Sequence, residues 1–150
     1  MEQKRKIVPP VYLLAALILM TAMHFWMPLA EFVPAPFNYG GAVLVLLGLG
    51  IVAVSARDFN KADTGIVPFD EATALVTGGF YRFSRNPMYL GMVFLLLGAA
   101  ILFGTVGSLL PIPFFIWLIR NHFIVGEERF LEEAFGEQYL DFKKQVRRWL

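Results

Sequence analysis

Four apolar stretches separated by polar segments run through the chain. They cover about residues 11–29, 38–56, 87–103 and 109–125. Each is close to the length that a helix needs to cross the hydrocarbon core of a bilayer. The pattern therefore predicts an all-α membrane protein with four transmembrane helices and a polar loop over residues 58–86.

Glycine and proline positions indicate where these helices begin and how they pack. Residues 104–108 form a turn too short to hold a domain, so the third and fourth helices are predicted to form an antiparallel hairpin. Pro87 stands at a helix start, where its missing N–H removes no hydrogen bond. Gly41 and Gly48 lie seven residues apart on one helical face, which favours close approach of a neighbouring helix.

Residues 127–150 have a different, amphipathic pattern. Their apolar residues recur at helical spacing, with Gly136 predicting a break or bend. We expect cytoplasmic amphipathic helices that lie along the membrane or fold back over the hairpin. The apolar face comprises Phe130, Ala134, Tyr139, Phe142, Val146 and Trp149, and the basic residues predicted to meet anionic lipid headgroups are Lys143, Lys144, Arg147 and Arg148.

Composition supports a single integral membrane domain over residues 1–150. Hydrophobic residues make up 57% of the chain and charged residues 17%, which is too apolar for an ordinary soluble fold. The net charge of +1 gives no basic field of the kind that binds nucleic acid. The chain has no cysteine, which excludes disulfides and thiolate metal sites. Because His24 and His122 are predicted at different depths in the membrane, we expect no metal.

The basic residues predict the orientation of the helices. All except Arg120, which lies within a span, fall on one side of the four-helix topology. By the positive-inside rule, both termini and the 58–86 loop are predicted to be cytoplasmic. These residues are Lys4, Arg5, Lys6, Arg57, Lys61, Arg82, Arg85, Arg129, Lys143, Lys144, Arg147 and Arg148.

Two polar clusters are candidates for chemistry. The first, residues 81–89 at the mouth of the third helix, contains two tyrosines, two arginines and an asparagine. The second is the pair Glu127 and Glu128 after the fourth helix. The hairpin places both at the cytoplasmic end, where they can meet and hold a ligand. The alternative is a non-catalytic membrane scaffold whose arginines and tyrosines only anchor the hairpin at the interface.

Arg120 and His122 interrupt the fourth apolar stretch before it ends. An ionisable residue within a membrane segment is a functional candidate by default. Together with Asn121 between them, they favour a functional site at this end of the bundle. The alternative for Arg120 is snorkelling toward the interface.

Two separated motifs carry a resemblance to a known family. The first is the segment Leu75-Val76-Thr77-Gly78-Gly79-Phe80-Tyr81-Arg82-Phe83-Ser84-Arg85-Asn86-Pro87-Met88-Tyr89-Leu90-Gly91. The second follows the hairpin and comprises Glu127, Glu128 and then Phe135-Gly136-Glu137-Gln138-Tyr139-Leu140-Asp141-Phe142-Lys143-Lys144. Over about residues 60–150 the chain resembles the isoprenylcysteine carboxyl methyltransferase family and its bacterial relatives, which are related to phospholipid N-methyltransferases.

The resemblance implies a membrane methyltransferase that uses S-adenosyl-L-methionine, held under the C-terminal segment, and a lipophilic acceptor that enters from the bilayer. The lead acceptor is the carboxylate of a prenylcysteine-like molecule, and the alternatives are a phospholipid amine and a small hydrophobic thiol. The implied cofactor residues are Thr73, Ala74, Leu75, Val76, Tyr81, Asn86, Pro87, Met88, Tyr89 and Glu127, supported by Arg85 and Glu128.

Two positions depart from the family pattern. Asn86 stands where the family has a histidine, so the side chain keeps its hydrogen bonding but does not titrate. Phe123 stands where the prenylcysteine enzymes have an arginine for the substrate carboxylate. Arg120 or His122 could substitute for that arginine. A carboxylate acceptor needs no general base, whereas an amine would need one, for which His122 is the candidate.

Overall fold

The computed structural model describes residues 8–65 and 72–150, and within them every regular element is a helix. Lys4, Arg5 and Lys6 of the predicted cytoplasmic set lie outside the described residues. The longer helices are α1 (Pro9–Trp26), α2 (Gly41–Lys61), α3 (Pro87–Phe103), α4 (Pro111–Ile119), α5 (Val125–Phe135) and α6 (Glu137–Gln145). The shorter ones are η1 (Phe37–Gly40), η2 (Gly79–Arg82), η3 (Val106–Leu109) and η4 (Arg120–Ile124), the last a π-helical turn. The predicted all-α class is confirmed.

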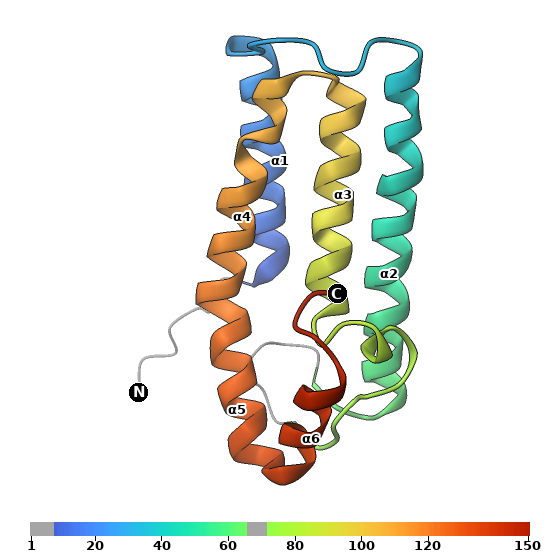
Figure 1. Ribbon diagram of the computed structural model, residues 1–150, viewed down its shortest axis with the longest axis vertical. Helices are drawn as coiled ribbons and strands as arrows, with labels where there is room; N and C mark the ends of the chain where they lie inside the picture. Colours follow the sequence, from blue (N-terminus) through green and yellow to red (C-terminus); the bar gives the residue numbers. More distant parts are fainter. Residues whose placement is uncertain (1–7, 66–71) are drawn as a thin grey trace.

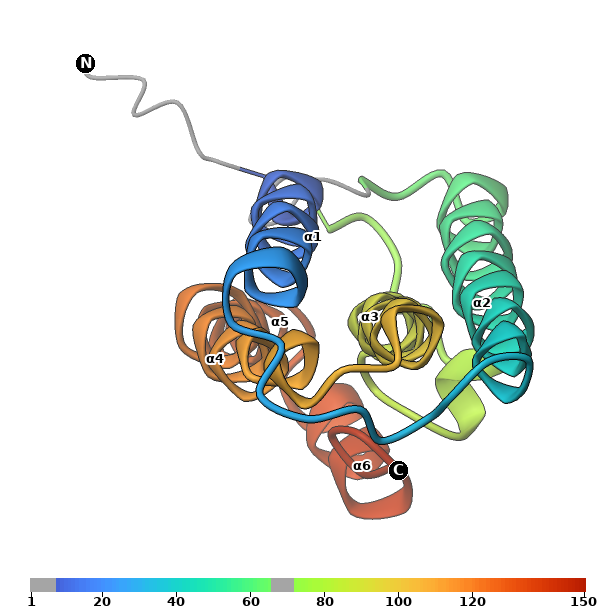
Figure 2. The same cartoon turned by 90° about the horizontal axis from the view of Figure 1, so that it is seen from above.

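The apolar helices stand side by side, with α3 between α2 and the pair formed by α1 and α4 (Figures 1 and 2). Three apolar helical stretches are long enough to cross a membrane: Pro9–Trp26, Phe37–Lys61 and Val106–Phe135. The fourth, α3, has 17 residues and is apolar on all sides, as its central position requires. Large apolar side chains such as Leu14, Ile18, Leu46 and Trp117 remain exposed on the outer helices, where lipid would cover them. The chain is an integral multi-pass membrane protein.

Small residues let α2 and α3 approach closely. A methyl group on Gly48 would lie 2.5 Å from the carbonyl oxygen of Gly91, and one on Gly98 would lie 2.6 Å from the carbonyl oxygen of Gly41. The same seven-residue spacing leads to Ser55 on α2 and to Ser84 just before α3, both almost fully buried. The packing predicted from Gly41 and Gly48 is therefore confirmed, and it fixes α2 against the start of α3.

Two helices run further than the apolar pattern indicates. Helix α2 continues past the predicted end at residue 56 to Lys61, because Phe59 on its last turns packs against the buried Tyr81. No break separates the fourth apolar stretch from the C-terminal segment, since α4, η4 and α5 follow one another directly to Phe135. The predicted break at Gly136 is confirmed, because Gly136 has a φ of 52°.

After Gly136 the chain folds back toward the start of α3, where its C-terminus lies (Figure 1). Tyr139, Phe142 and Val146 are buried in a small core that also contains Tyr81. Three of the four basic side chains predicted to meet lipid headgroups form ion pairs within the protein, Lys143 with Glu132, Lys144 with Asp141 and Arg148 with Glu128. The prediction is wrong for Lys143 and Arg148, because the C-terminal segment turns them toward the carboxylates of α5. Lys144 and its partner on α6 are both exposed.

Candidate functional site

A cavity of about 350 Å³ lies between α2, α3, α5 and α6, near the start of α3. Segments far apart in the sequence line it, and they include most of the residues that the two motifs predict for a cofactor site. Those predicted residues are Ala74, Leu75, Val76, Tyr81, Arg85, Asn86, Met88, Tyr89, Glu127 and Glu128. The fold therefore brings together the mouth of the third helix and the glutamate pair.

Two predicted cofactor residues lie beside the cavity lining. Thr73 is exposed, and its hydroxyl donates to the carbonyl of Asp63 at 2.8 Å while its N–H donates to Thr64 Oγ1 at 3.2 Å. Pro87 is fully buried at the first position of α3. Both hold the backbone that carries the lining residues.

Arg120 and His122 lie apart from the cavity. Both are exposed on the π-turn η4, and neither lines the cavity. His122 Nδ1 lies 3.2 Å from the carbonyl oxygen of Leu118, and its ring lies 6.1 Å from that of Tyr12. Phe123, next in sequence, is buried against Tyr12. A role of Arg120 or His122 toward an acceptor stays a prediction.

Tyr89 and Glu127 form a polar pair in the cavity lining. The Tyr89 hydroxyl donates a hydrogen bond to Glu127 Oε1 at 2.8 Å. Among the described residues, no cationic side chain forms an ion pair with Glu127. A partly buried carboxylate without a cation attracts a positively charged ligand group.

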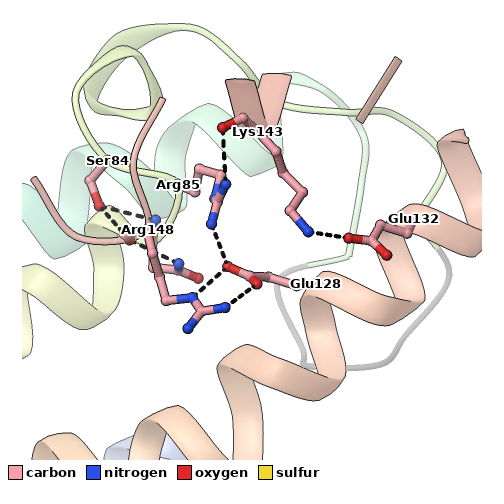
Figure 3. Close-up of polar contacts among 7 residues, drawn as sticks. Ser84, Arg85, Glu128, Glu132, Lys143 and Arg148 are labelled. Carbon is pink, nitrogen blue, oxygen red and sulfur yellow. Dashed lines mark hydrogen bonds and ion pairs between the residues drawn. The ribbon is translucent and has the colours of Figure 1, made fainter. Parts of the chain in front are cut away.

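Glu128, also in the lining, is the centre of a second polar cluster that contains Arg85 and Arg148 (Figure 3). Arg85 Nη2 donates to Glu128 Oε1 at 3.0 Å, and Arg148 donates to both carboxylate oxygens, from Nε at 3.0 Å and from Nη2 at 2.7 Å. The side chains of Arg85 and Glu128 are only 9% and 7% exposed. Arg85 Nη1 donates to the carbonyl of Lys143 at 3.3 Å, whereas its Nε is buried without a partner.

The last residues of the chain hold the start of α3 by their main chain. The Arg85 N–H donates to the carbonyl of Arg147 at 2.9 Å. The carbonyl of Arg148 accepts from the Ser84 hydroxyl at 3.2 Å and from Asn86 Nδ2 at 3.0 Å. Asn86, which stands where the family pattern has a histidine, therefore uses its amide to fix the C-terminal segment of residues 146–150.

Sequence reasoning missed Arg148, and it did not place Tyr139 and Phe142 in the cavity lining. The amphipathic spacing of Tyr139 and Phe142 predicts burial, but spacing alone does not identify the surface they cover. Arg148 is one of several basic residues near the C-terminus. Only its contacts distinguish it from Arg147, whose side chain is exposed.

Tyr81 is buried in the cavity wall, where its ring packs edge-on against Phe59 at 5.5 Å between centroids. Burial, together with the carboxylates of Glu127 and Asp58, raises the pKa of Tyr81 far above its usual value. Its phenol therefore remains a hydrogen-bond donor at every physiological pH. Burial raises the pKa of Tyr139 in the same direction.

The Tyr81→Phe variant is expected to leave the alkaline tyrosinate absorbance unchanged. Ordinary tyrosines ionise near pH 10, so the signal develops between about pH 9 and 11, where Tyr81 stays protonated. Ultraviolet titration of the purified protein and the variant measures this. A smaller rise in the variant than in the unmodified protein would contradict the burial of Tyr81.

Comparison with known proteins adds independent findings. The family description "phospholipid methyltransferase" matches residues 37–138. The chain is 30% identical over 108 residues to protein-S-isoprenylcysteine O-methyltransferase of Saccharomyces cerevisiae, covering 71% of this chain and 45% of that protein. It is 27% identical over 108 residues to protein-S-isoprenylcysteine O-methyltransferase A of Arabidopsis thaliana, covering 71% of this chain and 55% of that protein. The chain thus spans about half the length of these relatives.

A solved structure has the same fold. The eukaryotic intramembrane Ras methyltransferase ICMT (isoprenylcysteine carboxyl methyltransferase) matches with a TM-score of 0.65 over 97% of this chain and 52% of that chain. Sequence identity is 18%, so this likeness concerns the fold. It covers α1, which the family match over residues 37–138 does not reach.

Proposed function

This chain belongs to the phospholipid methyltransferase family, and from that premise we propose that it transfers a methyl group from S-adenosyl-L-methionine to a lipophilic acceptor. The lead acceptor is the carboxylate of a prenylcysteine-like molecule. The observation that carries the proposal is the cavity at the start of α3, whose lining holds both the carboxylate of Glu127 and the guanidinium of Arg85.

The residues in the cavity fit the amino-acid end of this cofactor. Glu127, held by Tyr89, would accept the ammonium group, and Arg85 has a buried Nε free to donate to the carboxylate. Ala74, Leu75 and Val76 supply apolar wall for the remainder of the molecule. When bound, S-adenosyl-L-methionine supplies an electrophilic methyl group on a positively charged sulfur.

The remaining lining supports a lipophilic acceptor. Val52 and Ala56 of α2 and Met92 of α3 continue the cavity wall along the membrane helices. These side chains would exclude water, which strengthens the attraction between an anionic acceptor and a cationic donor. The protein's main contribution is then alignment of the two reactants.

A carboxylate acceptor fits the cavity better than an amine. Methylation forms the bond between carboxylate oxygen and methyl carbon while the bond between sulfur and methyl carbon breaks, so no proton has to move. An amine would require a base, and His122 lies outside the cavity lining. The carboxylates that do line the cavity, Glu127 and Glu128, are already engaged by Tyr89 and by two arginines. Phospholipid amine methylation and thiol methylation are the alternatives that the test below distinguishes.

We further propose that both termini and the cavity face the cytoplasm. The exposed side chains of Arg57, Lys61, Arg82 and Arg147 all belong to the end of the bundle that carries the cavity. At the opposite end, the described connections between α1 and α2 and between α3 and α4 contain no lysine or arginine. This asymmetry follows the positive-inside rule.

Transfer of labelled methyl to a total membrane extract tests the function. We expect a labelled lipophilic product whose label is released by mild base, as a methyl ester requires. Base-stable label on an amine headgroup or on sulfur would replace the lead acceptor with one of the alternatives. Calorimetry with S-adenosyl-L-homocysteine accompanies the assay, and absence of both binding and transfer would favour a non-catalytic scaffold.

A further inference from the structure

Two positively charged arginines surround the single negative charge of Glu128. Glu128 carries one negative charge and contacts two guanidinium groups, those of Arg85 and Arg148. The neighbouring cation Lys143 is paired with Glu132 and so does not change this balance. The cluster therefore holds one surplus positive charge beside the cavity.

Arg85 is the residue that presents this surplus positive charge to the cavity. The Arg85 side chain is nine-tenths buried, lines the cavity and has an Nε without a partner. Arg148 is more exposed, at 32%, and directs Nε and Nη2 to Glu128. If Arg148 were absent, Glu128 would neutralise Arg85 alone, and an anion in the cavity would meet a neutral pair.

We propose that Arg148 is a positioning residue that satisfies Glu128 and thereby leaves the positive charge of Arg85 available to a carboxylate in the cavity. This inference rests on the proposed function, because both the cofactor and the lead acceptor carry a carboxylate. Glu127, which accepts the hydrogen bond of Tyr89, adds a negative charge to the same lining. This combination favours the cofactor, which carries an ammonium group beside its carboxylate.

Binding of two ligands tests the inference in the full chain in detergent. One is S-adenosyl-L-homocysteine, and the other is its decarboxylated analogue, which keeps the amine and lacks only the carboxylate. The ratio of their dissociation constants, measured by calorimetry, reports how strongly the site recognises the carboxylate. In Arg148→Gln we expect this ratio to fall about tenfold, the size of one charge-assisted hydrogen bond, with little change for the analogue.

Two further variants separate charge from structure. Arg148→Lys keeps the charge and is expected to preserve most of the ratio. Arg147→Gln removes a charge from the adjacent residue, whose side chain is exposed, and is expected to leave the ratio unchanged. Equal weakening of both ligands in Arg148→Gln, or an equal loss of ratio in Arg147→Gln, would overturn the inference.

The remaining outcomes show whether the recognised carboxylate belongs to the cofactor or to the acceptor. They also show whether a negative result concerns the proposed function or only the role of Arg148. A raised KM for a prenylcysteine-like acid in Arg148→Gln, with the cofactor ratio unchanged, would assign the recognised carboxylate to the acceptor. If the unmodified protein binds neither ligand, the proposed function itself fails. If it binds both and the ratio and this KM are unchanged in Arg148→Gln, only the role of Arg148 is lost.

Discussion

Replacing Glu127 by glutamine is expected to lower the affinity for S-adenosyl-L-homocysteine about a hundredfold and to reduce methyl transfer at least as much. The substitution keeps the size of the side chain and an oxygen that can accept the Tyr89 hydroxyl at 2.8 Å in the present structure. It removes the negative charge that Glu127 contributes to the cavity lining. Because the ligand's ammonium group would lose a charged partner in a site with little water, the effect is larger than at a surface position.

Glu133→Gln is the matched control for this experiment. Glu133 lies on the same helix, α5, and is exposed, so its charge is screened by solvent. In calorimetry, the dissociation constants of the two variants for S-adenosyl-L-homocysteine should differ about a hundredfold. Equal affinities for the two variants would show that Glu127 does not face the ligand, and the proposed cofactor site would need a different arrangement.

Much of the site follows from the sequence because its two halves lie on strongly patterned segments. The apolar stretches and the short 104–108 turn fix the hairpin, and the hairpin alone brings Tyr89 near Glu127. The glycine spacing in α2 similarly predicts a close helix contact. These features depend on local periodicity and loop length, which the sequence displays directly.

The parts that escaped prediction depend on long-range contacts or on a local change of helical register. Arg148 and Lys143 look like lipid-facing cations in sequence, and only the fold of the C-terminal segment supplies their carboxylate partners. The π-turn η4 inserts an additional residue relative to α-helical register, so the faces of the residues after it cannot be counted at 3.6 residues per turn. In that turn Arg120 and His122 are exposed while Phe123 is buried.

Gly48→Ala is expected to destabilise the folded protein, although alanine is the better helix former. The added methyl would lie 2.5 Å from the carbonyl oxygen of Gly91 and 2.7 Å from the backbone nitrogen of Leu95, and neither backbone atom can move without shifting α3. Overpacking of this kind costs about 1–3 kcal/mol. Thermal unfolding in detergent should therefore show a lower midpoint than for the unmodified protein.

Gly50→Ala, on the same helix, is the control, and its unfolding midpoint is expected to rise. No atom of another part of the protein lies within 4 Å of a methyl group at Gly50, so only the helix propensity changes, which favours alanine by about 1 kcal/mol. If both variants have a lower unfolding midpoint, the loss of stability comes from the contact of α2 with lipid or detergent and not from its contact with α3. A lower midpoint in Gly48→Ala alone, together with weaker S-adenosyl-L-homocysteine binding, would show that this contact also sets the cavity wall, since Val52 and Ala56 of α2 line it.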